Sequence, residues 1–180
     1  RYHKDSTGNT GADCARVYGV TYSKHKLWYE RRAVLNEGMS GNFVGYTNSS
    51  SYPFYVASNG NSGHELYLYN GNKNTSNSTS YFEVRAWVEQ APIDLKFDYA
   101  YSCEQNYDFF NFYVNNSRVF HYSGTDDYNW KTYTYTITAR GYYTFKFEYT
   151  KDGSNDGGSD QVCVDNIRFT SEAADQRANS

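Results

Sequence analysis

The chain lacks any long run of apolar residues. None of its apolar runs approaches the roughly 20 residues that a membrane-spanning helix requires, so the sequence predicts no insertion into a membrane. Proline and methionine are also scarce, with two and one residues in a chain of 180. Tyrosine, by contrast, occurs 21 times, and Tyr, Thr, Asn and Gly together favour pleated sheets and turns over helices.

The chain also lacks a strong charge of either sign. Its formal net charge is −3, which does not favour a nucleic-acid partner held by phosphate contacts. The basic clusters are short, and we interpret Lys24, Lys26, Arg31 and Arg32 as a solvated face. The sequence therefore predicts no nucleic-acid binding.

Signatures of common catalytic and metal sites are absent as well. The four histidines are scattered without the spacing of a zinc enzyme, and the chain contains no nucleophile elbow and no EF-hand loop. Glu83 and Glu89 share one predicted strand but lie about 20 Å apart at the usual rise, too far for either geometry of glycoside hydrolysis. No neighbouring feature lowers the pKa of Cys103. The sequence therefore predicts a protein that is not an enzyme.

Cysteine is too rare to define a disulfide framework. Three cysteines allow at most one bridge. Cys103 and Cys163 both fall in predicted strands, and they form either a disulfide or two free buried thiols, whereas Cys14 is expected to be unpaired. The many Asn, Ser, Thr and Tyr residues indicate an extracellular surface, so we expect a secreted or cell-surface location. The start at Arg1, without a signal peptide, is what an excised or processed fragment would show.

Short runs in which apolar residues alternate with polar ones recur along the chain. This period of two predicts strands with one dry and one wet face, and many short strands at roughly 8–12-residue spacing predict an all-β, two-sheet antiparallel β-sandwich. We expect a lead-in segment at 1–14, a single sandwich module at 15–170 and a tail at 171–180. Segment 26–37 predicts either a short helix or a strand at 27–35. The predicted strands are 15–22, 42–46, 54–57, 65–69, 81–89, 93–103, 109–114, 119–122, 132–138, 142–149 and 162–169.

The predicted strand 81–89 carries the sharpest candidate for a binding site. Its alternation places Phe82, Val84, Ala86 and Val88 on one face. The opposite face then carries Tyr81, Glu83, Arg85, Trp87 and Glu89. Sugars present flat CH faces and a rim of hydroxyl groups, which aromatic rings flanked by charged and amide groups can grip.

Other aromatic residues could extend this candidate site. Tyr67 and Tyr69 also point away from the core by their alternation and could sit on a neighbouring strand, and Trp28 could join them. The alternative is that the same face packs against a second layer or a covering loop.

The last half of the chain, from about Ile93 to Phe169, resembles a known group of modules. The residues that carry the resemblance are Ser102-Cys103-Glu104, Tyr107-Asp108-x-Phe110, Phe112-Tyr113-Val114, Ser123-Gly124, Trp130-Lys131, Tyr133-x-Tyr135-x-Ile137, Gly141, Phe145-x-Phe147-x-Tyr149-x-Lys151-Asp152, Gly158-x-Asp160 and Val164-Asp165-Asn166-Ile167-x-Phe169. This pattern is similar to the concanavalin-like jelly-roll modules of bacterial surface and secreted proteins, which include MAM-like, cleaved-adhesin-like and carbohydrate-binding modules. The resemblance implies a jelly roll in which Trp130 is a structural residue at the edge of the core.

The resemblance also implies a structural calcium ion. Calcium binds clustered oxygen atoms, and the candidate ligands near strand ends are Asp165, Asp160, Glu104 and Asp108. Asp165 and Asn166 interrupt an otherwise apolar strand, so they need partners, either the backbone of the 158–160 loop or a cation. The alternative is that these acidic residues only cap backbone amides in turns.

Together these patterns predict a non-catalytic carbohydrate-binding module. We expect it to bind a polysaccharide or glycan through exposed aromatic residues and to be joined to other modules of a larger secreted or surface protein. Two alternatives are a protein-binding module of the adhesin type and a structural spacer domain.

Overall fold

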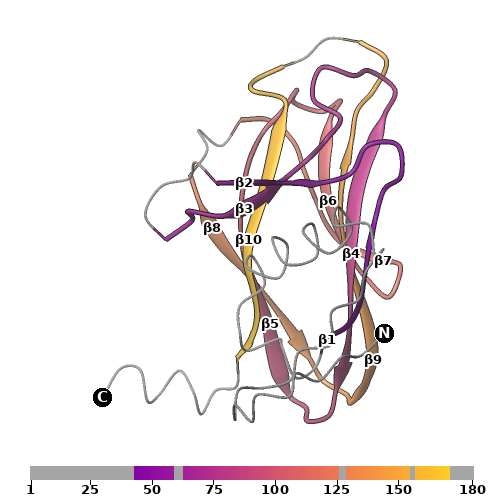
Figure 1. Cartoon of the computed structure of the whole chain (residues 1–180), viewed down its shortest axis with the longest axis vertical. Coiled ribbons are helices and arrows are strands. Elements are labelled where there is room, and N and C mark those ends of the chain that lie inside the picture. Colours follow the sequence, from indigo (N-terminus) through magenta and orange to yellow (C-terminus); the bar gives the residue numbers. More distant parts are fainter. Residues whose placement is uncertain (1–42, 59–62, 126–128, 155–156, 171–180) are drawn as a thin grey trace, which may run out of the picture.

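The computed structural model describes residues 43–58, 63–125, 129–154 and 157–170, and within them the chain forms ten strands and no helix (Figure 1). Nothing in this part of the chain therefore forms a helix capable of crossing a membrane. The strands are β1 (Phe43–Asn48), β2 (Tyr55–Ala57), β3 (Tyr67–Tyr69), β4 (Thr79–Val88), β5 (Ile93–Ser102), β6 (Phe109–Val114), β7 (Ser117–Tyr122), β8 (Lys131–Ile137), β9 (Gly141–Thr150) and β10 (Gln161–Thr170). Each matches a predicted strand to within a few residues, while the predictions for 15–22 and 26–37, with Cys14 and Trp28, lie outside the described residues.

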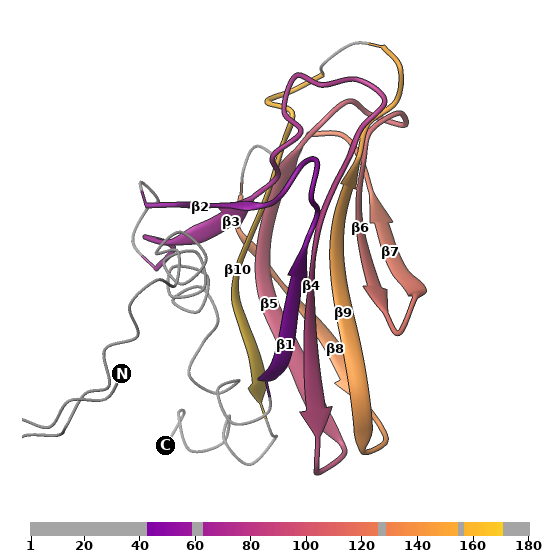
Figure 2. The same ribbon diagram turned by 45° about the vertical axis from the view of Figure 1, so that its right-hand side comes forward.

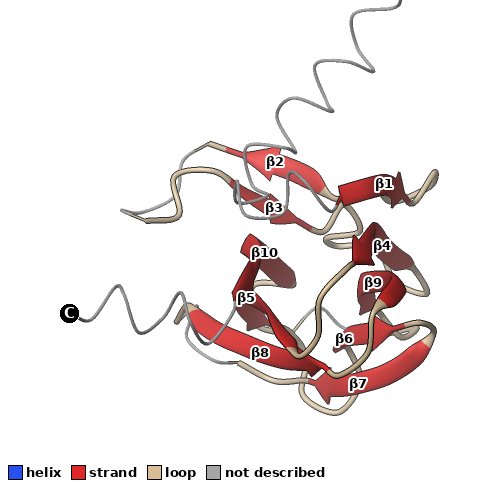
Figure 3. Ribbon diagram, turned by 90° about the horizontal axis from the view of Figure 1, so that it is seen from below, coloured by secondary structure: helices blue, strands red, loops and turns tan. Residues whose placement is uncertain are grey.

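The ten strands form two sheets of five. The first sheet has the order β1-β4-β9-β6-β7 and the second has the order β2-β3-β10-β5-β8. The paired strands are antiparallel, and the view along the strands shows the sheets as two facing layers (Figure 3). The predicted fold class, an all-β two-sheet antiparallel sandwich of the jelly-roll type, is confirmed.

The chain changes sheet repeatedly between β3 and β10. Consecutive strands β3, β4, β5 and β6 alternate between the second and the first sheet, and so do β7, β8, β9 and β10. Figure 2 shows the first sheet toward the viewer, with β4 and β9 as its long central strands. Each strand, whichever sheet it belongs to, turns one apolar side toward the other sheet. The alternation in the sequence is therefore the same for strands of both sheets.

Aromatic rings from both sheets fill the space between the layers. Phe147 of β9 stacks on Phe82 of β4 with ring centroids 4.6 Å apart. The same ring meets Phe97 of the second sheet edge-on at 4.8 Å and lies 5.0 Å from Phe112 of β6. All four side chains are fully buried, and burial of such a ring stabilises the fold by about 1.5–3 kcal/mol. The two sheets are therefore held together by a continuous aromatic core.

A glycine-dependent loop closes one end of the sandwich. Gly158 has a φ of +66°, and a Cβ atom there would lie 2.5 Å from Ser102 Oγ. The backbone N–H of Ser159 donates to the same hydroxyl oxygen at 3.0 Å. Only glycine combines this left-handed conformation with such a close approach, and the contact fixes the 157–160 loop against the end of β5.

Cys103 and Cys163 are two free, buried thiols. Cys103 contacts the carbonyl oxygens of Asp108 and Gly124 at 3.5 and 3.6 Å, whereas Cys163 belongs to β10 and accepts a contact from Gln161 at 3.6 Å. The alternative of a disulfide between them is therefore wrong, and that of two buried thiols is confirmed.

Candidate functional site

The outward side of β4 and β9 forms the first candidate surface, which we call the Trp87 face. The buried residues of β4 alternate with those of its outer side, as the sequence predicted. Across the ladder, Trp87 lies opposite Tyr142 and Arg85 lies opposite Thr144. The Trp87 face consists of Tyr81, Glu83, Arg85, Trp87, Tyr142, Thr144, Lys146 and Glu148.

An aromatic pair occupies one end of the Trp87 face. The rings of Trp87 and Tyr142 lie 4.7 Å apart with an angle of 60° between their planes. The indole Nε1–H donates to Glu89 Oε2 at 2.5 Å, which fixes the orientation of the ring. Tyr142 is 72% exposed, so the pair presents apolar surface to solvent of the kind on which a sugar ring stacks.

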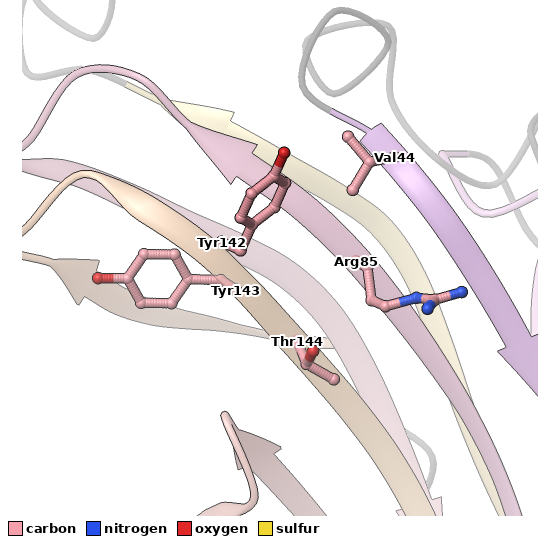
Figure 4. A pocket seen from close by; sticks show the side chains of 5 residues that line it. All are labelled: Val44, Arg85, Tyr142, Tyr143 and Thr144. Carbon is pink, nitrogen blue, oxygen red and sulfur yellow. The ribbon is translucent and has the colours of Figure 1, made fainter.

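A shallow pocket of about 290 Å³ lies next to this pair (Figure 4). Its lining residues are Val44, Arg85, Tyr142, Tyr143 and Thr144. The guanidinium of Arg85 reaches over β1, where a Cβ at Gly45 would lie 2.8 Å from Arg85 Nη2. The missing side chain at Gly45 therefore makes room for the charged group that borders the pocket.

A hydrogen-bonded network occupies the other end of the Trp87 face. Glu148 accepts hydrogen bonds from Tyr113 Oη at 3.0 Å and from Lys146 Nζ at 2.7 Å. Burial and the bond to Glu148 raise the pKa of Tyr113. Glu148 points outward as the alternation predicts, yet it is only 9% exposed, because side chains from the neighbouring strand β6 cover it.

Tyr67 and Tyr69 do not join Trp87 in one surface. Both lie on β3 with their side chains pointing outward, and Leu68 between them is buried, as the alternation predicted. However, β3 belongs to the second sheet and β4 to the first. The expectation that these tyrosines sit on a strand next to Trp87 is therefore wrong, because the alternation within a strand carries no information about which sheet the strand joins.

These tyrosines instead belong to a second candidate surface, which we call the aromatic row. It consists of Tyr55, Tyr69, Tyr67, Trp130 and His64. Successive ring centroids lie 5.9, 6.5, 5.7 and 4.0 Å apart, and the planes of the last two rings differ by only 10°. Trp130 lies outside the core cluster of the described residues and packs against Tyr67 and His64, so it is not at the edge of the core, and the structural role that the resemblance implies stays a prediction.

A buried carboxylate supports the end of the aromatic row. Asp165 Oδ2 lies 2.9 Å from His64 Nδ1, and Asp165 Oδ1 accepts the backbone N–H of Asn166 at 2.7 Å. Asp165 is only 3% exposed, and burial raises its pKa. The partner of Asp165 is therefore His64, which the sequence pattern did not indicate, and not the predicted backbone of the 158–160 loop. Because these two residues are 101 positions apart, no local signal could have paired them.

Three acidic side chains at the loop end of the sandwich could hold a metal ion. Glu104, Asp108 and Asp152 each offer an oxygen atom, and these atoms lie within 4.8 Å of one another. Asp108 also accepts the backbone N–H of Asp152 at 3.1 Å, and burial raises its pKa. Two of the four predicted ligands, Glu104 and Asp108, are therefore brought together, and Asp152 joins them.

The other two predicted ligands lie elsewhere. Asp165 is on the outer side of β10 beneath His64, as described above. Asp160 forms a buried ion pair with Lys151, and its Oδ1 lies 2.7 Å from Tyr149 Oη. The ammonium of Lys151 therefore already supplies the positive charge that this carboxylate needs, and the four predicted residues do not form one site.

Comparison with known proteins identifies similar folds but no family. No protein-family model matches the chain, and no curated protein matches it. Among solved structures, it is similar to TmCBM61 in complex with β-1,4-galactotriose, at 12% identity over 71% of this chain and 88% of that one, with a TM-score of 0.45. It is also similar to a C-terminal family 22 carbohydrate-binding module of Clostridium thermocellum, at 8% identity over 76% of this chain and 91% of that one, with a TM-score of 0.47.

A third similar structure is much longer than this chain. It is a Paenibacillus xanthan lyase, matched at 18% identity over 74% of this chain and 12% of the lyase, with a TM-score of 0.45. Identities and scores at this level say nothing about the function of this chain.

Proposed function

We propose that the chain is a non-catalytic carbohydrate-binding module that binds polysaccharide through the Trp87 face. The observation that carries this proposal is the pairing of Trp87 with Tyr142 on the outer side of a sheet, beside the pocket bordered by Arg85. The core does not use these rings, since they belong neither to the core cluster nor to the side chains packed against it. An outward-facing aromatic pair with charged neighbours, here the exposed Tyr142 and the half-buried Trp87, suits a sugar ring with its rim of hydroxyl groups.

The polar residues of the same face supply partners for hydroxyl groups. Arg85 offers several N–H donors at the pocket, and the partly exposed ammonium of Lys146, bonded to Glu148 at 2.7 Å, offers further donors. The bond to Glu148 holds Lys146 in place before a ligand arrives, which lowers the entropy cost of binding. Stacking at one end and hydrogen bonding at the other therefore suit an extended sugar chain lying along β4 and β9.

We extend the proposal to the setting of the module. A surface rich in Asn, Ser, Thr and Tyr supports a secreted or cell-surface location, and residues 15–170 are proposed to act as one module beside others in a larger bacterial protein. Glu104, Asp108 and Asp152 are proposed to bind one calcium ion, because their hard oxygen atoms suit that cation and backbone carbonyls or water could complete its coordination.

Affinity electrophoresis in gels containing neutral plant polysaccharides tests the proposal. We expect retardation in at least one gel, and we expect Trp87→Ala and Tyr142→Ala each to weaken binding at least tenfold, a loss of about 1.4 kcal/mol. The sugars bound by similar folds, β-1,4-galactotriose and methyl-galactose, are the first soluble ligands to try.

The matched control is Tyr107→Ala. Tyr107 is 57% exposed and lies in the connection between β5 and β6, away from both candidate surfaces. It should bind like the parent chain. If Trp87→Ala and Tyr142→Ala also bind like the parent, the Trp87 face is not the site. If no polysaccharide binds and a protein does, the alternative of an adhesin-type module replaces this proposal.

A further inference from the structure

We propose that the aromatic row is a second, independent carbohydrate-binding site, which takes a neutral polysaccharide on the side of the sandwich opposite the Trp87 face. This inference rests on the proposed function, since it assigns the same class of ligand to a different surface. A module with two such sites could link two polysaccharide chains.

The two surfaces are separated by the whole thickness of the protein. The Trp87 face belongs to β4 and β9 of the first sheet, whereas the aromatic row lies over β2, β3 and β10 of the second. The two sheets form facing layers (Figure 3), and in each sheet these side chains point away from the shared core, so the two surfaces lie on different sides of the sandwich. A sugar chain that lies flat on one surface therefore cannot contact the other surface.

The rings of the aromatic row are partly exposed and are not packed in the core. Tyr55 is 43% exposed, and Tyr67, Tyr69, Trp130 and His64 are half-buried. None of the five belongs to the core cluster or to the side chains packed against it. A contiguous group of rings on an outer sheet face is unusual unless the surface binds something, and flat rings in a line fit an elongated ligand.

The structure fixes the end of the row before any ligand binds. Asp165, buried beneath the surface, holds His64 through Nδ1 at 2.9 Å, and the imidazole stacks on Trp130 at 4.0 Å. Burying a carboxylate costs free energy, yet the buried carboxylate of Asp165 orients the His64 ring at the surface. Such an arrangement preorganises a stacking surface, which favours binding because little order has to be created when the ligand arrives.

Polar groups for sugar hydroxyls lie beside the rings. Asp98 accepts hydrogen bonds from Asn166 Nδ2 at 2.9 Å and from Thr132 Oγ1 at 2.6 Å, and Arg168 Nη1 lies 3.5 Å from the same carboxylate. The bulge in β10 between Asp165 and Arg168, with Asn166 at a φ of +48°, turns the Asn166 amide toward Asp98. Carboxylate, amide and guanidinium groups next to aromatic rings are the groups that a sugar-binding site uses for hydrogen bonding and stacking.

The charge of this surface selects a neutral ligand. The carboxylates of Asp165 and Asp98 lie at the His64 end of the row, and Arg168 contacts Asp98 at 3.5 Å. A polymer of uronic acids would bring further negative charge against them, which costs binding energy. A polymer of uncharged hexoses or pentoses meets no such repulsion.

Indole resonances in ¹H–¹⁵N NMR spectra can report on the two surfaces separately. The chain has three tryptophans, and Trp87→Phe and Trp130→Phe assign the two signals of interest. The probes are cellohexaose, xylohexaose, mannohexaose and β-1,4-galactohexaose, with a galacturonic acid oligomer as the acidic comparison. We expect at least one neutral probe to shift the Trp130 signal saturably and the acidic probe to leave it in place.

Variants then separate the sites. Tyr55→Ala and Tyr69→Ala should weaken binding at the Trp130 signal at least tenfold and leave the Trp87 signal responsive, while Tyr107→Ala should change neither. Loss of a ring from the short strands β2 and β3 could disturb the fold. Asp98→Asn, which keeps the shape of the side chain, therefore serves as a second variant of the same surface. In turbidity measurements with the matching long polysaccharide, the parent chain should cross-link, and variants of either surface should bind without cross-linking.

Each outcome decides between the two proposals. If a neutral probe shifts Trp87 and none shifts Trp130, the second site is overturned and the proposed function stands. If Trp130 responds and Trp87 does not, the aromatic row is the site and the Trp87 face is not. If neither signal responds to any neutral probe, both proposals are overturned.

Discussion

The buried ion pair between Lys151 and Asp160 is the most demanding interaction at the scale of single residues. Both side chains are almost fully buried, at 1% and 2% exposure, and Tyr149 Oη lies close to both Asp160 and Asp108. Charges removed from water in this way are tolerated only when each has its partners. The network therefore depends on every member being present.

We predict that Lys151→Met destabilises the fold by about 3–5 kcal/mol, because it leaves the Asp160 carboxylate buried without its counter-charge. Urea unfolding followed by tryptophan fluorescence measures the change. The double variant Lys151→Met/Asp160→Asn removes both charges and should recover most of the loss. Equal destabilisation in the single and double variants would contradict the importance of the pair.

The buried thiols give a second prediction at this scale. Burial raises the pKa of Cys103 and of Cys163 from 9.0 to about 12. Between about pH 9 and about pH 12 the unfolded chain releases these protons while the folded chain retains them, so the free energy of unfolding falls as pH rises. Their contribution is fully present below about pH 9.

Urea unfolding midpoints at about pH 8 and about pH 10.5 measure this effect. We expect a lower midpoint at the higher pH and a smaller drop in Cys103→Ala/Cys163→Ala, because this variant has lost the two titrating groups. Tyrosine ionisation contributes to the drop in both proteins and therefore cancels in the comparison. An identical drop in the parent and the variant would show that the thiols do not contribute.

At the scale of elements, β1 shapes the Trp87 face because Gly45 has no side chain. Gly45 lies opposite Arg85 in the ladder between β1 and β4, and the guanidinium occupies the space where a side chain would stand. We predict that Gly45→Ala leaves the free energy of unfolding within about 0.5 kcal/mol, because the flexible end of Arg85 can move aside. Polysaccharide affinity should nevertheless fall, since the donor at the pocket is displaced.

Affinity electrophoresis and urea unfolding of the same Gly45→Ala preparation measure both quantities. Gly153→Ala is a useful comparison, because a Cβ there would meet only the end of the Asn77 side chain, at 3.3 Å, and the residue lies in the loop after β9, away from β1. Unchanged affinity in Gly45→Ala would show that the position of Arg85 does not matter for binding.

At the scale of the whole molecule, we expect the proposed calcium ion to stabilise the fold. Glu104 and Asp108 precede β6, and Asp152 follows β9, so an ion bound by all three would tie distant parts of the chain together. A ligand that binds only the folded state stabilises it, by about 2.7 kcal/mol at a concentration one hundred times its dissociation constant. We therefore expect calcium to raise the melting temperature and EDTA to reverse the increase.

Thermal melts with calcium, with EDTA and with magnesium test this prediction. Asp152→Asn should abolish the response to calcium, while Asp94→Asn, which changes a carboxylate near the other end of β5, should retain it. A melting temperature that is the same in calcium and in EDTA would exclude a structural ion at this site.

Much of the fold could be predicted because strand geometry is local. Successive side chains of a strand point to opposite faces, so the alternation of residues 81–89 and 142–149 was sufficient to place Phe82 and Phe147 inside and Trp87 outside. The candidate site was predictable only in part. Tyr142 was missed because it is the second residue of β9, where the alternation had only begun, and because its contact with Trp87 depends on strand pairing.

The strands and the direction in which each side chain points could therefore be predicted, since both follow from the backbone of a few neighbouring residues. Which strands lie side by side follows instead from long-range packing. Pairing joins residues far apart in the chain, as Asp165 and His64 show, and a tyrosine on β3 points outward whichever sheet β3 joins. That long-range choice separated Tyr67 and Tyr69 from Trp87 and gave the molecule two aromatic surfaces in place of one.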